Sequence, residues 1–311
     1  MTTVAGIASV AVLERISIVT PLAVLFRDQA TRGFYSDGLS AVVYPLGEPE
    51  RTVSGVVNRS GVFVFRNLPG LRAVEQGSGD ADFWAAQTPR FDFVLAARDT
   101  AGRFLPWSLG VKLPQRHLLG IDLVGGMDAG SPPASPLAGQ TGSDTAFLPL
   151  FSAASRPAPE GMGVLRAELW DASAGEPAAW ALIEAKAGEQ RTVTGLADAD
   201  GRVMLPLPYP KPALSLGPPL GSPLGSPLGS GGPITQQSWP VAFTVRYRRR
   251  VPAPLIPDLA DVLRQPPVTA WQETSRTTVW TSATLRFGRD LVLASRADGG
   301  TAGSSTLLIT P

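Results

Sequence analysis

The chain has 311 residues, 44% of them hydrophobic, and its 27 basic and 26 acidic residues leave a formal net charge of +1. This length predicts two domains, and the balanced charge supplies no overall field to draw the protein to nucleic acid or an acidic membrane. Because cysteine is absent, disulfides, thiolate nucleophiles and cysteine-ligated metal sites are excluded.

The N-terminal segment 4–13 is apolar, but no basic residue precedes it, and Glu14 and Arg15 follow at once. A secretory signal begins with positive charge and has a longer apolar run. We therefore expect a first strand or an anchoring arm, synthesis in the cytoplasm without a signal peptide, and export, if any, within a released particle. Since no stretch approaches the roughly 20 apolar residues of a spanning helix, no membrane span is expected.

Short strands are predicted along the first half of the chain. Apolar residues alternate over 22–26 and 91–95, and the β-rich run 62–65 is bounded by turn residues. Strands of this length with turns between them predict an antiparallel β-sandwich rather than βαβ units. Residues 71–90 interrupt the pattern, and we expect them to be a mobile loop or to be ordered by a partner.

Two polar residues of the first half are candidates for chemistry. Asp99 follows an apolar strand as the active aspartate of an aspartic protease does, but those enzymes need two aspartates, and the corresponding region of the second half is Arg248-Arg249-Arg250. We interpret Asp99 as part of a hairpin turn and His117, the only histidine, as an ordinary surface or hydrogen-bonded residue.

A Pro/Gly/Ser-rich segment separates the two halves. Residues 126–160 contain several prolines and glycines and predict a linker that is stiff in part and loose in part. Within it, the apolar run 147–151 is expected to hold the linker against one domain. The predicted organisation is a first domain 1–125, a linker 126–160 and a second domain 161–311.

An internal repeat is the strongest feature of the sequence. Residues 50–55, Glu-Arg-Thr-Val-Ser-Gly, match 190–195, Gln-Arg-Thr-Val-Thr-Gly, at an offset of 140. The polar turns 58–61 and 198–201 follow at the same offset, and 41–43 match 181–183 upstream. Residues 25–28 match 168–171 at a slightly larger offset. The repeat predicts two tandem sandwich domains of similar topology.

The second copy carries two long connections. Residues 211–238 include three Pro-Leu-Gly-Ser units, a low-complexity tract that cannot bury enough surface to order itself in isolation. Residues 252–275 contain the only predicted helix, 257–264. Asp198, Asp200 and Gly201 resemble part of a calcium loop, but an EF-hand needs a glutamate six residues after its glycine, where this chain has Leu207. We interpret them as a turn.

The segment 58–70 resembles the carboxypeptidase regulatory-like domain, in which a hairpin with the pattern polar-x-x-Gly-x-Phe-x-Phe-x-x-Leu-Pro-x-Gly follows a strand ending in glycine. In the second copy, 198–205 keep the first half of the pattern, and Pro206-Leu207-Pro208 depart from the second. The resemblance implies a transthyretin-like β-sandwich used as a rigid module, with no catalytic residues. A chain with two such units, long inserts and no cysteine is also similar to an accessory component of contractile, phage-tail-like injection particles.

Two kinds of side chain are candidates for contact with a partner. Four arginines surround Tyr247, and they could bind phosphate while Tyr247 stacks on a base, contact an acidic protein, or face solvent. Tryptophans in or beside the inserts could anchor an interface, stack on sugars or cap the sandwiches. The predicted contact residues are Trp84, Trp107, Trp239, Arg246, Arg248, Arg250 and Trp271.

These observations predict a non-catalytic structural or adaptor subunit with other protein subunits as partners. We expect no cofactor, no metal, no catalytic residue and no nucleic-acid partner. The alternative is a carbohydrate-binding or adhesion module that uses loop tryptophans, and a carboxylate-based hydrolase is disfavoured.

Overall fold

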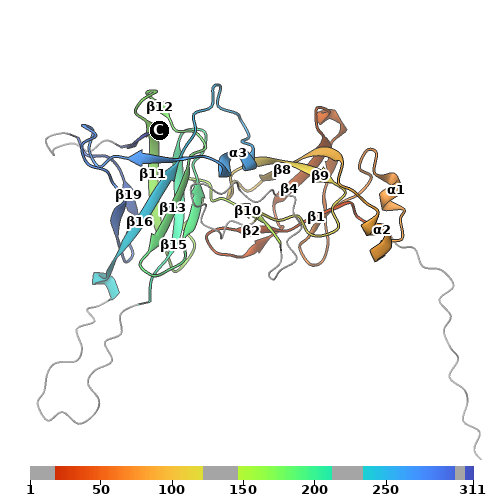
Figure 1. Cartoon of the computed structure of the whole chain (residues 1–311). Coiled ribbons are helices and arrows are strands. Elements are labelled where there is room, and N and C mark those ends of the chain that lie inside the picture. The colour runs from red at the N-terminus through yellow and green to blue at the C-terminus, as the bar shows by residue number, and fades with distance from the viewer. Residues whose placement is uncertain (1–17, 122–145, 212–233, 298–304) are drawn as a thin grey trace, which may run out of the picture.

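The computed structural model describes residues 18–121, 146–211, 234–297 and 305–311. In these ranges the regular structure is almost entirely β-strand, so the predicted all-β fold class is confirmed. Figure 1 shows the strands gathered in two bodies that lie side by side, the first half in red to yellow and the second in green to blue. The segment 4–13, residues 126–145 of the predicted linker and the Pro-Leu-Gly-Ser tract lie outside the described residues.

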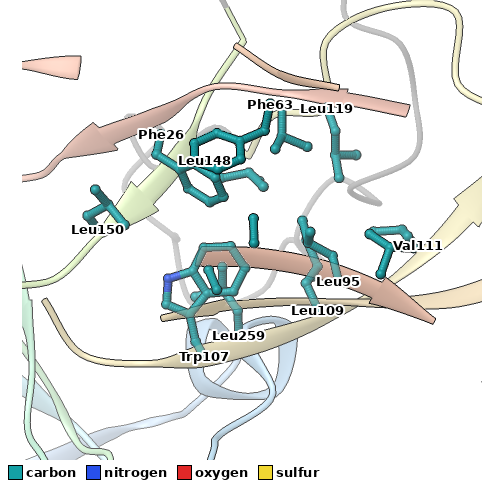
Figure 2. Close-up of a cluster of buried hydrophobic side chains, with 14 of the residues drawn as sticks. Phe26, Phe63, Leu95, Trp107, Leu109, Val111, Leu119, Leu148, Leu150 and Leu259 are labelled. Atoms are coloured by element: carbon teal, nitrogen blue, oxygen red, sulfur yellow. The ribbon is translucent and has the colours of Figure 1, made fainter. Parts of the chain in front are cut away.

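The first unit is a sandwich whose two layers meet in one apolar core. One layer holds two three-stranded sheets. The first has the strand order β1 (Leu22–Val24), β7 (Phe63–Phe65), β6 (Val56–Val57). The second has the order β10 (Leu148–Leu150), β2 (Phe26–Asp28), β3 (Phe34–Tyr35). The other layer is ordered β5 (Val53–Ser54), β4 (Leu39–Pro45), β8 (Phe91–Asp99), β9 (Trp107–Leu113). Figure 2 shows Phe26 and Phe63 from the first layer facing Leu95, Trp107 and Leu109 from the second.

The C-terminal part of the predicted linker belongs to this core. Strand β10 pairs in parallel with β2, with Leu148 opposite Phe26, and Leu148, Leu150 and Phe151 are fully or almost fully buried. The expectation that 147–151 pack on one domain is confirmed, and the first unit extends through Arg156, which pairs with Asp28 at 2.9 Å, so that 147–156 are part of this unit and not of the predicted linker. This pairing adds a parallel contact to sheets that are otherwise mostly antiparallel, because a long connection, unlike a tight hairpin, can bring a strand back in the same direction.

The first insert is ordered by its own domain. It forms α1 (Arg72–Glu75) and α2 (Ala81–Ala85), and Leu71 and Val74 are buried in the first core. The Asp80 carboxylate begins α2 by accepting a hydrogen bond from the Phe83 N–H at 2.7 Å. The expectation that 71–90 are mobile or need a partner is therefore wrong, because two apolar side chains tie the segment to the core.

The second unit is built around the long strand β11 (Met162–Asp171). It pairs antiparallel with β15 (Arg202–Pro208) and β12 (Glu176–Pro177), and parallel with β19 (Leu291–Leu293) and β20 (Leu307–Thr310). The opposite layer holds β13 (Leu182–Ala187), β14 (Val193–Leu196), β16 (Ser238–Arg246) and β18 (Ser282–Arg286). Strand β17 (Pro267–Ala270) pairs with both β16 and β20 and so joins the two layers along one side.

The strand pairing shows that the repeat extends to three dimensions. Leu22 on β1 lies opposite Phe65, and Leu165 on β11 lies opposite Leu205, which are the corresponding positions. The turns after β2 and β11 also match: Asp28 Oδ1 accepts from the Ala30 N–H at 2.9 Å, and Asp171 Oδ1 accepts from the Ser173 N–H at 2.8 Å. The two units therefore share the connections that the sequence repeat predicted.

One stretch of the predicted alignment is wrong by two residues. Val43 pairs with Val53, and Ala185 pairs with Val193, so the structural equivalent of Val43 is Ala185, at an offset of 142. The sequence match of 41–43 with 181–183 placed it at Ile183. A shift of two residues keeps every side chain on the same face of a strand, so the apolar pattern could not reveal it.

The predicted helix of the second copy is confirmed as α3 (Leu259–Leu263). Its first turn is capped by Asp258, whose carboxylate accepts a hydrogen bond from the Asp261 N–H at 2.9 Å. Leu259, Val262 and Leu263 are buried, and they belong to the core cluster of the first unit. Figure 1 places α3 at the boundary between the two bodies, and the helix contacts β9. Two short 3-10 helices, Pro49–Arg51 and Ile234–Gln236, complete the described elements.

Candidate functional site

Trp107 is a core residue and not a loop residue as the sequence suggested. It lies on β9 with no exposed surface, its ring centroid is 6.0 Å from that of Phe26, and its indole N–H donates to the Pro149 carbonyl at 3.0 Å. Figure 2 shows it within the first core, beside Leu259. Since the indole is fully covered, it offers no surface to a partner, and this candidate is withdrawn.

The other three predicted tryptophans are half-buried and lie on different elements. Trp84 on α2 packs partly on the first core. Trp239, at the start of β16, lies 5.3 Å from the ring of Tyr209, which lies 4.9 Å from the ring of Phe287. The indole of Trp271 donates to Thr310 Oγ1 at 2.9 Å. Within the described ranges, no ring contact joins one of these tryptophans to another.

The arginine cluster is paired with carboxylates of the same chain. Arg249 makes two hydrogen bonds to Glu176, at 2.6 and 3.2 Å, and this interaction holds the pKa of the Glu176 carboxyl below its usual range. Arg248 and Arg250 both reach Asp261 on α3, at 3.4 and 2.7 Å, respectively. Arg246 lies 3.4 Å from Glu184. The cluster therefore connects elements of the second unit, and its role in contacting a partner stays a prediction.

Tyr247, between these arginines, is buried in the second core. Burial raises the pKa of its hydroxyl to about 12, with Asp171 and Glu176 adding to the effect and Arg249 and Arg250 opposing it. A ring in this position cannot stack on a nucleic-acid base. The phosphate-and-base interpretation of the cluster therefore loses its aromatic component.

The acidic candidates for chemistry form turns. Asp198 Oδ1 accepts from the N–H groups of Asp200 and Arg202, at 2.9 and 2.8 Å, and Asn58 Oδ1 accepts from Ser60 and Val62 in the same way. The turn interpretation is confirmed in both copies.

Asp99 also belongs to a turn, the hairpin between β8 and β9. Its carboxylate accepts hydrogen bonds from Arg103 and from three backbone N–H groups, including that of Arg103 at 2.6 Å. Burial acts to raise the pKa of Asp99, but these hydrogen bonds outweigh it and leave the pKa below its usual value. His117, the remaining candidate, is exposed in the loop after β9.

The contact between the two units is a structural feature that sequence reasoning missed. Trp180, Leu182 and Leu196 of the second unit join α3 in the core cluster of the first unit. The Ser108 N–H on β9 donates to the Pro257 carbonyl just before α3, at 2.9 Å, and Figure 2 places Leu259 of α3 beside Trp107 and Leu109. The apolar spacing of 259, 262 and 263 was the one sequence signal of this interface.

Polar contacts reinforce this interface. Arg191, at the start of the repeated segment, donates to the backbone carbonyls of Gln29 and Ala30 in the turn after β2. Arg166 reaches the Ala154 carbonyl at 3.3 Å. Beside these contacts, an open hollow of about 430 Å³ lies between the units, lined by Leu105, Ala153, Ala154, Ser155, Asp198 and Arg202. Its one acidic residue, Asp198, accepts the backbone hydrogen bonds of the turn 198–201.

Comparisons with known proteins identify no family. No protein-family model and none of the curated proteins match the chain. Among solved structures, it is similar to the Bacillus anthracis TIE protein at 8% sequence identity and a TM-score of 0.20, over 92% of this chain. The chain spans 34% of that protein's length, and a similarity at this level supports no conclusion about fold or function. In the described residues, no helix is long and apolar enough to cross a membrane.

Proposed function

We propose that this protein is a non-catalytic structural or adaptor subunit of a larger multi-protein assembly. The observation that carries the proposal is the buried contact between the two sandwiches, in which α3 and Leu196 of the second unit enter the core cluster of the first. A contact of this kind fixes the distance and orientation of two modules, which is what a spacer or adaptor needs. The charged side chains that were candidates for chemistry have structural roles. Asp99 and Asp198 accept the hydrogen bonds of turns, and the arginines form ion pairs.

The finer part of the proposal is that the assembly is a contractile, phage-tail-like injection particle. It rests on the domain organisation alone: two tandem sandwich units with long connections and no cysteine. Isolation of the native complex tests both levels. The chain would be tagged at its own locus in the host, purified under mild conditions, and analysed by mass spectrometry and electron microscopy.

We expect defined partner subunits in fixed ratio to the tagged chain, and a tube with a sheath in the micrographs. If the micrographs show a different kind of particle, the proposal of an injection system is rejected and the adaptor role stands. Recovery of the chain alone, from host cells that express it at its native level, would contradict the adaptor role.

One observation favours the alternative of carbohydrate binding. Tyr209, Trp239 and Phe287 form a half-buried aromatic cluster in the second unit, and exposed parts of such rings can stack on sugars. Glycan-array binding that is lost in Trp239→Ala and kept in Trp84→Ala would support this function. An array without signal for the wild-type protein would reject it.

A further inference from the structure

One sequence segment occurs in both units, and it is buried in the second unit but exposed to solvent in the first. In the second unit, the segment 190–197 is covered by the first unit: Arg191 donates to the carbonyls of Gln29 and Ala30, and Leu196 is 1% exposed. Its strand, β14, stands at the end of its sheet. This edge of the second unit is thus a docking surface, and its occupant within the chain is the turn after β2.

The matching segment of the first unit, 50–57, is open. Val56, which aligns with Leu196, is 61% exposed, and Val57 beside it is 40% exposed. Arg51, which aligns with Arg191, forms an ion pair with Glu48 at 2.6 Å in which both side chains are about half exposed. An exposed pair of this kind contributes little to stability, so Arg51 is able to change partner. Strands β5 and β6 also end their sheets, and an apolar sheet edge is a template for pairing with another chain.

The complementary turn is present in open form as well. Ala30, which Arg191 contacts, is 3% exposed, and the aligned residue of the second unit, Ser173, is exposed. The two turns make an equivalent backbone hydrogen bond: the Gln29 N–H donates to the Leu150 carbonyl at 3.1 Å, and the Ala172 N–H donates to the Ile309 carbonyl at 2.9 Å. The interface therefore has two halves, an edge and a turn, and the chain carries each of them twice. The edge 190–197 and the turn after β2 contact each other, whereas the edge 50–57 and the turn 171–173 are open.

We propose that the open edge 50–57 of the first unit binds the turn 171–173 of the second unit of another copy of this chain, head to tail. The inference rests on the proposed docking function and specifies its surface and its partner. The partner is a second copy because the contact inside the chain already pairs the equivalent edge, 190–197, with the equivalent turn after β2. Such a heterologous contact need not close on itself, and it adds copies in a row.

The contact between copies is weaker than the internal one. Helix α3 lies in the connection between β16 and β17, whereas the corresponding connection in the first unit, between β8 and β9, is the short hairpin turn 100–106. The apolar side chains of α3 are therefore missing from the open edge. The association is consequently expected to depend on concentration, with Val56 and Arg51 supplying most of the contact.

Sedimentation velocity of the purified full chain over a wide concentration range tests the proposal. The wild-type sedimentation coefficient should rise with concentration. Val56→Asp should stay at the monomer value, because it places a charge on the docking edge. Val292→Asp is the matched control, since Val292 is 60% exposed on β19 and lies outside both surfaces, and it should associate as the wild type does. Ser173→Trp should stay monomeric, because its bulk blocks the turn.

A mixture of two variants tests the head-to-tail geometry. Val56→Asp keeps an intact turn and Ser173→Trp keeps an intact edge, so an equimolar mixture should form a one-to-one dimer and nothing larger. A wild-type chain that stays monomeric at all concentrations would overturn the proposal, as would association that survives Val56→Asp or a mixture that stays monomeric. If the pure chain is monomeric but the native complex loses a different subunit when Val56 is changed, the docking function stands and the second copy is the wrong partner.

Discussion

At the scale of single residues, Arg51 and Arg191 occupy equivalent positions of the sequence repeat but contribute differently to the stability of the fold. Both follow an acidic or amide residue and precede Thr-Val in the repeat. Arg191 is bound to two carbonyls of the other unit, and burial, reinforced by Arg32, lowers the pKa of its guanidinium. Arg51 faces solvent beside Glu48. The contribution of each arginine is therefore set by its neighbours and not by its motif.

We predict that Arg191→Ala lowers the free energy of unfolding by about 1–3 kcal/mol, because two carbonyl acceptors at the interface lose a charged donor. Arg51→Ala serves as the matched control and should change it by less than about 0.5 kcal/mol in dilute solution. Urea denaturation followed by tryptophan fluorescence measures both. Equal losses for the two variants would contradict the assignment of Arg191 to the interface.

Asp99 gives a pH-dependent prediction. Because its pKa is lowered in the folded state, the ionised carboxylate contributes stability that is present above its unfolded pKa of about 3.9 and is lost as the pH falls through the folded value. Asp99→Asn should therefore cost about 1.5–3 kcal/mol at neutral pH, and the difference from the wild type should shrink below about pH 4.

Urea midpoints measured from pH 3 to pH 7 by circular dichroism check the Asp99 prediction. The control is Asp92→Asn, since Asp92 forms an exposed pair with Lys112 at 3.0 Å. A pair of this kind contributes little at any pH. A constant gap between wild type and Asp99→Asn over this range would show that the charge of Asp99 is not what stabilises the turn.

At the scale of elements, the two polar turns 58–61 and 198–201 are built alike but packed differently. Gly61 and Gly201 have φ angles of +76° and +77°, a region that favours glycine. A Cβ at Gly61 would meet only the Ser36 side chain at 3.7 Å, whereas a Cβ at Gly201 would lie 2.4 Å from the Leu169 carbonyl oxygen. The second turn is therefore pressed against β11, and the first is open.

Gly61→Ala should lower the free energy of unfolding by about 1 kcal/mol, the cost of placing a side chain at positive φ. Gly201→Ala should cost clearly more, because the alanine also collides with backbone that cannot move without disturbing β11. Thermal unfolding of both variants, recorded by calorimetry, gives the comparison. Similar losses would mean that β11 shifts to accommodate the alanine.

The elements that could be predicted from the sequence are those specified by local chemistry. The turns at 58–61 and 198–201, the first part of β8 at 91–95 and α3 each carry their signal within a few residues. Strand β10 could not be assigned, because Leu148-Pro149-Leu150 becomes a strand only by pairing with β2, far away in the chain. Helix α1 was missed for the same reason: it is a single turn, held by the burial of Leu71 and Val74.

The candidate contact residues were harder to predict than the fold. Trp107 stands near a proline and a turn in the sequence, yet β9 carries it into the core. The arginines at 246–250 indicated a free basic surface, but the acidic residues that pair with them, Glu176 and Asp261, lie in other elements. Which carboxylate pairs with which arginine is decided by the tertiary structure. The sequence pattern shows the arginines but not the acidic residues that the fold brings beside them.

At the scale of the whole molecule, the shared core cluster determines how the two units behave together. Buried residues of both halves form one cluster, and α3, from the second half, packs on β9 of the first. The second unit also has a core of its own, which includes Leu205, Phe243 and Leu293. Because this cluster is shared, neither unit can unfold without exposing apolar surface of the other, and the chain should unfold as one.

We therefore predict a single calorimetric transition for the wild type, with calorimetric and van't Hoff enthalpies in agreement. Leu259→Ala removes a fully buried side chain from the shared cluster and should cost about 2–5 kcal/mol. Because this loss falls on the contact between the units, it should raise the ratio of calorimetric to van't Hoff enthalpy above one. Leu293→Ala, a change of the same kind inside the second core, should lower the transition temperature and leave the ratio closer to one. Two separate transitions in the wild type would mean that the units are only loosely joined, and the rigid spacing on which the adaptor role depends would be lost.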